Sequence, residues 1–373
     1  MRRNHSDDLR GASKLTVELV KRITSAVEGM HREIASGPGV LGQPLAASAR
    51  VLTALAYGGV KLTADRIGAV LDRALVVLAP LLGEGAAGRP RESARAALNA
   101  VLGDYLAESG NPLAIAMRLR VVTKSRRMIV MVHGSGMSDE QWRRHDHDHG
   151  AALAAATDWG LAYAHYNSGL HISENGAQLA ELLGDLPADD IVLIGFSMGG
   201  LVARSAVEQG PAWRDRVRAL MFLGVPHHGA PLERGGNWLQ ALTGVSRYSA
   251  PLTQLMRIRS AGVTDLRYGN VREEDWRDRD RFALGGDPRV PLPLPAGVPC
   301  YAIAATRSEA TAKRLASDGL VPVASALGDH ANASLNIPEA HRAILHEASH
   351  LDLLDRTEVY AQLATWMGEL PPH

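Results

Sequence analysis

Short apolar runs alternate with helical segments from about residue 115 onward, and this alternation restricts the fold more than any other feature of the sequence. The runs are continuously apolar, which is typical of parallel strands covered by helices on both faces. Helices are expected between several of them, notably at Gly176–Leu183 and Met198–Glu208. The pattern predicts a mostly parallel α/β sheet flanked by helices. Its predicted strands are Met128–Val132, Leu161–Tyr166, Ile191–Phe196, Ala219–Val225, Cys300–Ala305 and Arg342–Leu345, preceded by a half-exposed strand around Met117–Val121.

The first 124 residues have a different pattern, rich in Ala and Leu at helical spacing. Leu15, Leu19, Ile23, Val27 and Met30 fall on one face of a predicted helix. We therefore expect a helical N-terminal region over 1–124 and an α/β domain over 125–373. The helical region fits a packing or homo-oligomerisation element, and it also fits a peripheral membrane anchor. Further helices are predicted at Leu45–Tyr57, Leu62–Leu82 and Arg91–Glu108.

The charge balance and the single cysteine exclude some classes of protein. Lys and Arg total 40 and Asp and Glu total 40, so the chain lacks the excess positive charge of a nucleic-acid binder. Cys300 is the only cysteine, which excludes an intramolecular disulfide. Charges from Arg2 through Arg22 leave no apolar signal-peptide core, and the runs Val51–Val60 and Ala74–Leu82 are shorter than the roughly 20 residues that cross a bilayer. We expect a cytoplasmic protein with no nucleic-acid partner.

The segment Gly195–Gly199 reads Gly-Phe-Ser-Met-Gly and directly follows a predicted buried strand. A strand that feeds a helix through a tight turn forces the serine into a strained backbone conformation. Glycines two residues before and two after it remove the clash and expose the hydroxyl at the carboxyl edge of the sheet. Ser197 is therefore predicted to be a nucleophile.

A nucleophilic serine also needs backbone N–H groups that hold the developing oxyanion. His133–Met137 reads His-Gly-Ser-Gly-Met and follows an earlier predicted strand. We predict that the amides of Ser135 and Met198 form the oxyanion hole.

A base and its orienting acid are expected after the serine, in the chain order Ser, Asp, His. Asp318 follows the Cys300–Ala305 strand, and His350 follows the Arg342–Leu345 strand. We predict Asp318 as the acid and His350 as the general base. Asp329 and His346 are the alternatives.

Five motifs follow one another along the chain: His133-Gly134, Gly195–Gly199, Pro226–Gly229, Asp318–Pro322 and His350–Asp352. In this order they resemble the bacterial lipase and esterase branch of the α/β-hydrolase superfamily. The resemblance covers roughly residues 125–365 and implies the α/β-hydrolase fold with a triad of Ser197, Asp318 and His350. Related lipases often place calcium beside the catalytic histidine, where Asp352 matches a ligand, but Arg356 stands where a neutral oxygen is expected. We therefore expect no metal or other cofactor.

Two histidine-rich segments lie outside the predicted triad and have to be interpreted separately. Three histidines alternate in His145–His149, which invites a metal site, but no distant ligand is evident. A solvated loop that opens the next helix is the preferred interpretation. His227 and His228 end a strand and are expected to shape a pocket wall.

Residues 230–290 form a long insertion between two predicted strands. Apolar helices over the carboxyl edge would make a lid and an acyl-binding surface, although an extra pair of core helices fits the same pattern. The predicted substrate-binding residues are Trp238, Leu239, Leu242, Tyr248 and Leu252.

Together these features predict a carboxylic-ester hydrolase that acts through an acyl-enzyme on small-molecule or lipid-like esters. A thioesterase or a polyester depolymerase would use the same triad. A catalytically silent scaffold that serves as a binding module is the remaining alternative.

Overall fold

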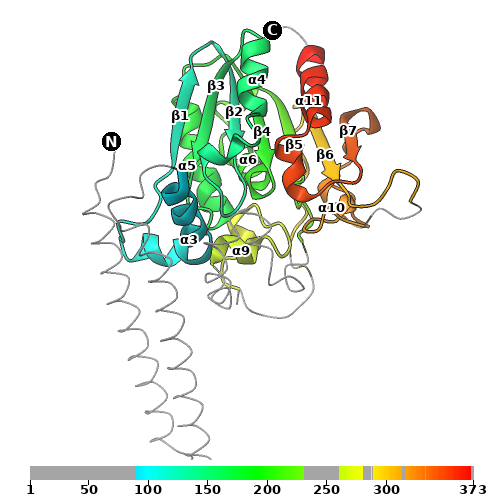
Figure 1. Cartoon of the computed structure of the whole chain (residues 1–373). Coiled ribbons are helices and arrows are strands. Elements are labelled where there is room, and N and C mark those ends of the chain that lie inside the picture. Colours follow the sequence, from blue (N-terminus) through cyan, green and yellow to red (C-terminus); the bar gives the residue numbers. More distant parts are fainter. Residues whose placement is uncertain are drawn as a thin grey trace, which may run out of the picture. The chain divides into compact units, whose positions relative to one another are not determined.

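The computed structural model describes residues 89–230, 260–279, 287, 289–312, 316–331 and 333–370. In these segments a seven-stranded sheet has the order β1-β3-β2-β4-β5-β6-β7. β1 runs antiparallel to β3 and the other neighbouring strands are parallel, so the predicted mostly parallel sheet is confirmed (Figure 1). The strands are β1 (Arg118–Thr123), β2 (Arg127–Val132), β3 (Gly160–His165), β4 (Asp190–Phe196), β5 (Val217–Leu223), β6 (Cys300–Ala305) and β7 (Arg342–Leu345).

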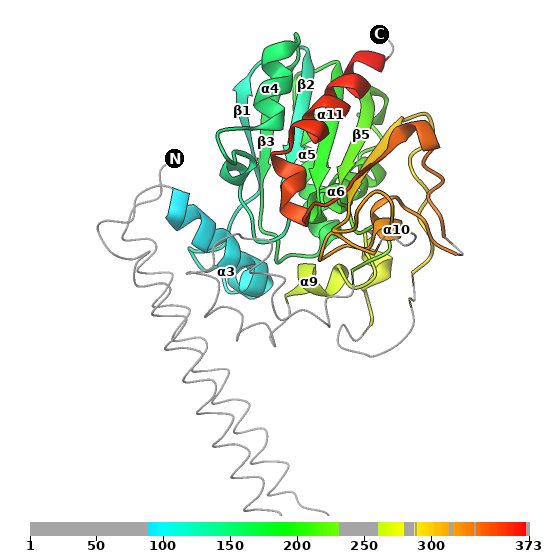
Figure 2. The same cartoon turned by 45° about the vertical axis from the view of Figure 1, so that its right-hand side comes forward.

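Helices cover both faces of this sheet, which explains why the central strands are apolar on both sides. Side chains alternate along β4, so Leu193 joins one apolar core while Val192 and Ile194 join the other. Figure 2 shows α4 and α11 in front of the sheet and α5 and α6 behind it. The longer helices are α3 (Arg89–Glu108), α4 (His149–Ala156), α5 (Ile172–Gly184), α6 (Met198–Gln209) and α11 (Thr357–Glu369).

The carboxyl ends of the parallel strands lie at one edge of the sheet, and the predicted site residues follow those ends. The short helices α9 (Ala261–Asp265) and α10 (Val323–Ala326) lie at this edge (Figure 1). Single 3-10 turns complete the described elements: η1 (Asp139–Trp142), η2 (Arg214–Arg216), η5 (Glu273–Asp275), η6 (Glu339–His341) and η7 (His350–Leu354).

The compact unit that holds the sheet begins earlier than the predicted boundary at residue 124. It comprises Gly88–Glu108 and Ala114–His373. β1 belongs to it because its residues pair with β3, from Arg118 opposite His165 onward. The second unit comprises Met1–Ala87 and Ser109–Leu113. The predicted helices before residue 89 lie outside the described residues.

None of the helices in the described segments combines the length and the apolar character that a membrane span requires.

Candidate active site

Ser197 occupies a strained turn between β4 and α6. Its φ is 52° and its ψ is −125°, a conformation that costs energy for any residue with a side chain. A Cβ on Gly195 would lie 2.4 Å from Gly200 Cα, and one on Gly199 would lie 2.1 Å from the Val132 carbonyl oxygen. The structure therefore has the tight strand-to-helix turn that the glycine spacing predicts.

The close approach at Gly199 gives a test of this turn. Gly199→Ala would push a methyl group against the backbone of β2, and we expect it to lower the free energy of unfolding by about 3 kcal/mol. Gly368 is the matched control, because it is exposed in α11 and has no heavy atom within 4 Å of a built Cβ. Gly368→Ala should raise stability by about 0.5–1 kcal/mol. Urea denaturation of both variants measures the difference, and equal stabilities would contradict the tight turn.

The loop after β2 runs beside Ser197. A Cβ on Gly134 would lie 3.2 Å from Ser197 Cβ. Hydrogen bonds from Met137 N to Gly134 O (3.3 Å) and from Gly136 N to Ser168 Oγ (3.0 Å) help to hold the loop.

The two predicted oxyanion donors are backbone amides at this edge. The Ser135 amide makes no hydrogen bond to any described residue. The Met198 amide is the first of α6, so no carbonyl within the helix is available to it. Both amides thus remain available to an anionic oxygen.

Asp318 and His350 are brought together although they are far apart in the chain. Asp318 Oδ2 lies 2.6 Å from His350 Nδ1, and both side chains are buried. The other carboxylate oxygen, Oδ1, accepts the amides of Leu320 and Val321 at 2.8 Å each. Burial raises the pKa of Asp318, but the charge and hydrogen bond of His350 and the two amides outweigh it, so the pKa lies below its usual value.

The pairing with Asp318 determines which nitrogen of the His350 ring carries the proton. An ionised carboxylate only accepts hydrogen bonds, so Nδ1 carries the proton and Nε2 is left as a base. Nε2 is buried and has no partner in the part of the chain that the structure describes. The ring lies 4.7 Å from the Phe196 ring, beside the residue that precedes Ser197.

Within the described segments, no hydrogen bond joins Ser197 Oγ to His350 Nε2. Catalytic hydrogen bonds are often long in the absence of substrate and tighten when it binds.

The alternative acid and base do not pair with these groups. Asp329 Oδ1 accepts a hydrogen bond from Arg342 Nη1 at 2.9 Å. His346 directly follows β7, and its buried Nδ1 has no described partner. The geometry therefore favours Asp318 and His350.

Asp352, the residue that matches a calcium ligand, instead caps the turn that begins with His350. Its Oδ2 accepts the amide and the hydroxyl of Ser349, at 2.6 and 2.8 Å. Among the residues described, no group of three or more His, Cys, Asp or Glu is arranged to hold a metal ion.

The histidine-rich segment His145–His149 does open a helix, as expected, but it is only partly solvated. α4 begins at His149, which is buried, and Asp148 caps it by accepting the Ala151 amide at 2.9 Å. His147 Nε2 lies 2.8 Å from His149 Nδ1, whereas His145 Nδ1 contacts Asp355 Oδ2 at 2.6 Å. These contacts show that the histidines pack the start of α4 against neighbouring segments. The predicted acyl-binding residues of the insertion, Trp238, Leu239, Leu242, Tyr248 and Leu252, lie outside the described residues.

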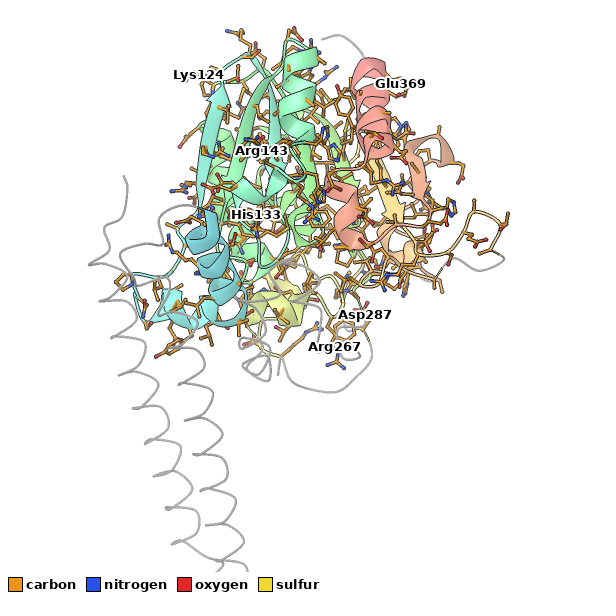
Figure 3. All side chains as sticks on the ribbon, in the orientation of Figure 1. Lys124, His133, Arg143, Arg267, Asp287 and Glu369 are labelled. Carbon is orange, nitrogen blue, oxygen red and sulfur yellow. The ribbon has the colours of Figure 1, made fainter. Side chains whose placement is uncertain are left out.

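The sequence interpretation named His133 but missed its partner Tyr166 and the loop contact Ser168, which help to hold the predicted oxyanion loop. His133, labelled in Figure 3, stacks on Tyr166 at 4.2 Å, and its Nδ1–H donates to Gly134 O at 2.8 Å. Tyr166 Oη donates to the carbonyl of His133 at 2.6 Å. Burial lowers the pKa of His133 to about 3, so the ring stays neutral at ordinary pH. Tyr166 and Ser168 follow β3 and belong to no motif, which is why the sequence did not reveal them.

Comparison with known proteins gives matches of low identity. A family model described as "Domain of unknown function (DUF7379)" matches residues 104–266, and no curated protein matches. Among solved structures, lipase BlEst2 of Bacillus licheniformis in its mature form is 18% identical, with 69% of this chain and 98% of that chain covered and a TM-score of 0.45. Naproxen esterase of Bacillus subtilis is 15% identical, with 68% and 87% covered and a TM-score of 0.40. A non-heme bromoperoxidase (BpoC) from Mycobacterium tuberculosis, described as putative in its own name, is also 15% identical, with 69% and 97% covered and a TM-score of 0.39.

At such identities and TM-scores these likenesses carry no information on chemistry or substrate. The fold follows from the chain's own features, which are the strand order, the antiparallel edge strand and the serine at the strained turn after β4. By these features the chain is a protein of the α/β-hydrolase fold.

Proposed function

We propose that this chain hydrolyses carboxylic esters, with Ser197 as the nucleophile, His350 as the general base and Asp318 as the acid that orients it. The observation that carries the proposal is the buried pair of Asp318 and His350, which leaves Nε2 as a free base beside the strained serine turn.

The reaction proceeds in two acyl-transfer steps. His350 Nε2 takes the Ser197 proton while Oγ bonds to the ester carbonyl carbon, and the amides of Ser135 and Met198 hold the resulting oxyanion. The oxyanion collapses, the alkoxide leaves with the proton from Nε2, and an acyl-enzyme remains. Water then gives a proton to Nε2 and attacks the acyl carbon. The second oxyanion collapses, the bond to Ser197 Oγ breaks, and Nε2 returns the proton to Oγ as the acid is released. Asp318 stays ionised throughout and stabilises the imidazolium.

A thioester or a polyester is cleaved by the same steps, so these remain alternative substrates. A silent scaffold is less well supported. A buried base nitrogen without a described partner costs stability, and proteins keep such costly groups mainly at functional sites.

A series of nitrophenyl esters from acetyl to palmitoyl tests the proposal. We expect saturable hydrolysis with kcat of about 1–1000 s⁻¹ on the best ester. A matched acyl thioester distinguishes a thioesterase, which would show the higher kcat/KM on the thioester. A folded protein without activity on either series would contradict hydrolysis.

The cellular context is also a proposal. We propose a cytoplasmic location, supported by the lone cysteine, Cys300, which is buried and free. Contact with a membrane surface or with a second copy through the predicted N-terminal helices stays a prediction, which flotation of the full chain with liposomes tests for the membrane.

A further inference from the structure

A cavity of about 230 Å³ lies among described residues away from Ser197. Its walls include Arg204 of α6, His227 and His228 after β5, and Leu292 and Leu335 from two later segments. Arg204 is about two helical turns beyond Ser197, or roughly 10 Å along α6 at 1.5 Å per residue. Asp287, another wall residue, is labelled in Figure 3 well apart from His133.

Arg204 is a buried cation in the wall of this cavity. It is 5% exposed and forms no ion pair with any described residue. Its Nη2 donates to Leu292 O at 2.8 Å and its Nη1 to His227 Nδ1 at 3.2 Å. Burial lowers its pKa to about 10, which still leaves it charged at neutral pH. A buried charge of this kind is costly unless an anion compensates it.

His227 adds a second hydrogen-bond donor to the wall of the cavity. A guanidinium only donates, so His227 Nδ1 accepts from Arg204 and the ring proton is on Nε2. His227 is 1% exposed, and its Nε2–H has no described acceptor. Burial and the charge of Arg204 hold the pKa of this ring well below its usual value, so it stays neutral.

His228 adds a hydrogen-bond acceptor to the wall of the same cavity. Its Nε2–H donates to the Gly328 carbonyl at 3.1 Å, so Nδ1 carries a lone pair. Nδ1 is buried and has no partner among the residues described.

The carboxylates that line the cavity are already occupied. Asp287 pairs with Arg289, with Nε to Oδ1 at 2.9 Å and Nη2 to Oδ2 at 2.7 Å. Asp275 Oδ2 accepts the amides of Val271 and Arg272 at 2.9 Å each. Neither forms an ion pair with Arg204 among the described residues, although the nearby charge of Asp275 favours the charged form of the guanidinium. Much of the remaining wall is apolar: Val271, Val290, Pro291, Leu292, Ala333 and Leu335.

We propose that this cavity binds a short-chain hydroxycarboxylate. The carboxylate accepts from Arg204 and from His227 Nε2–H, the hydroxyl donates to His228 Nδ1, and the carbon chain packs on the apolar wall. Binding needs no turnover, so it is independent of the proposed ester hydrolysis.

Calorimetric titration of the full chain with 3-hydroxybutyrate tests the proposal, with Ser197→Ala as a second protein that cannot turn over esters. We expect saturable binding of one equivalent to both proteins. Butyrate should bind about fivefold more weakly because it lacks the hydroxyl. 1,3-Butanediol and inorganic phosphate should bind at least about tenfold more weakly, since they lack the carboxylate or the carbon chain.

Two kinds of variant connect the binding to this cavity. Arg204→Met should abolish binding, and it should keep or raise the melting temperature because it removes an uncompensated buried charge. Val290 is 70% exposed at the wall, so Val290→Glu should weaken binding about threefold by repelling the anion without affecting folding, while Val290→Gln should not. The proposal is overturned if 3-hydroxybutyrate does not bind, if the diol or phosphate binds equally well, or if Val290→Glu and Val290→Gln bind alike.

Discussion

Ser197→Ala is expected to lower kcat on a nitrophenyl ester by about 10⁶-fold, the loss seen when the nucleophile of a serine hydrolase is removed. Only the attacking oxygen is lost, because alanine keeps the Cβ and the strained backbone of the turn is unchanged. The Ser197 side chain makes no capping hydrogen bond to α6, so folding should not be affected.

Ser135→Ala is the matched control for that result. Ser135 is also buried, and its Oγ has no described partner, but its predicted role belongs to its backbone amide. We expect this variant to retain kcat within about threefold, since the amide donor that holds the oxyanion is still present. Initial rates at saturating ester measure both variants. If Ser197→Ala remained active, or if both serine variants lost activity equally, Ser197 would not be the nucleophile.

Asp318→Asn is expected to lower kcat by about 10⁴-fold with the fold intact. The amides of Leu320 and Val321 both donate to Oδ1, so the asparagine oxygen will occupy that position and its NH₂ group will face His350. The NH₂ group donates to Nδ1, which moves the ring proton to Nε2. Nε2 can then no longer accept the Ser197 proton.

Asp329→Asn separates this explanation from a general effect of lost charge. Asp329 pairs with Arg342 and is half exposed, and we expect no more than about a twofold change in kcat. The ratio of the two kcat values is the decisive quantity. A large loss in Asp329→Asn with activity kept in Asp318→Asn would make Asp329 the acid.

The strands could be predicted from the sequence because covered parallel strands are continuously apolar. Cys300–Ala305 and Arg342–Leu345 have the predicted bounds, and the others differ by one or two residues at their ends. The predicted domain boundary at residue 124 separates β1 from the sheet to which it belongs. β1 lies before this boundary, yet it pairs with β3.

The candidate site residues were easiest to predict where the proposed chemistry dictates the local sequence. The glycines around Ser197 are required by the turn, so they reveal the serine. The choice of Asp318 over Asp329 depends on which carboxylate meets His350, and no local pattern encodes that distance.

Arg204 shows a different limit of sequence interpretation. A charged residue in a helix usually indicates an exposed face, yet every residue of α6 from Met198 through Val207 is buried. α5 packs along α6, and Val271 reaches it through the hydrogen bond from Ser205 Oγ to its carbonyl at 2.6 Å. The periodicity of the α6 sequence does not show which distant segments will cover each of its faces, so it could not predict that Arg204 is buried.

The most direct test of the central proposal is the position of a covalent label. A fluorophosphonate probe reacts with a serine that a neighbouring base activates, and peptide mass spectrometry locates the adduct. We expect one adduct, on Ser197, formed at a rate that falls at least about 100-fold in His350→Ala. A folded protein that remains unlabelled, or that carries the adduct on another residue, would contradict the proposed arrangement of Ser197, His350 and Asp318.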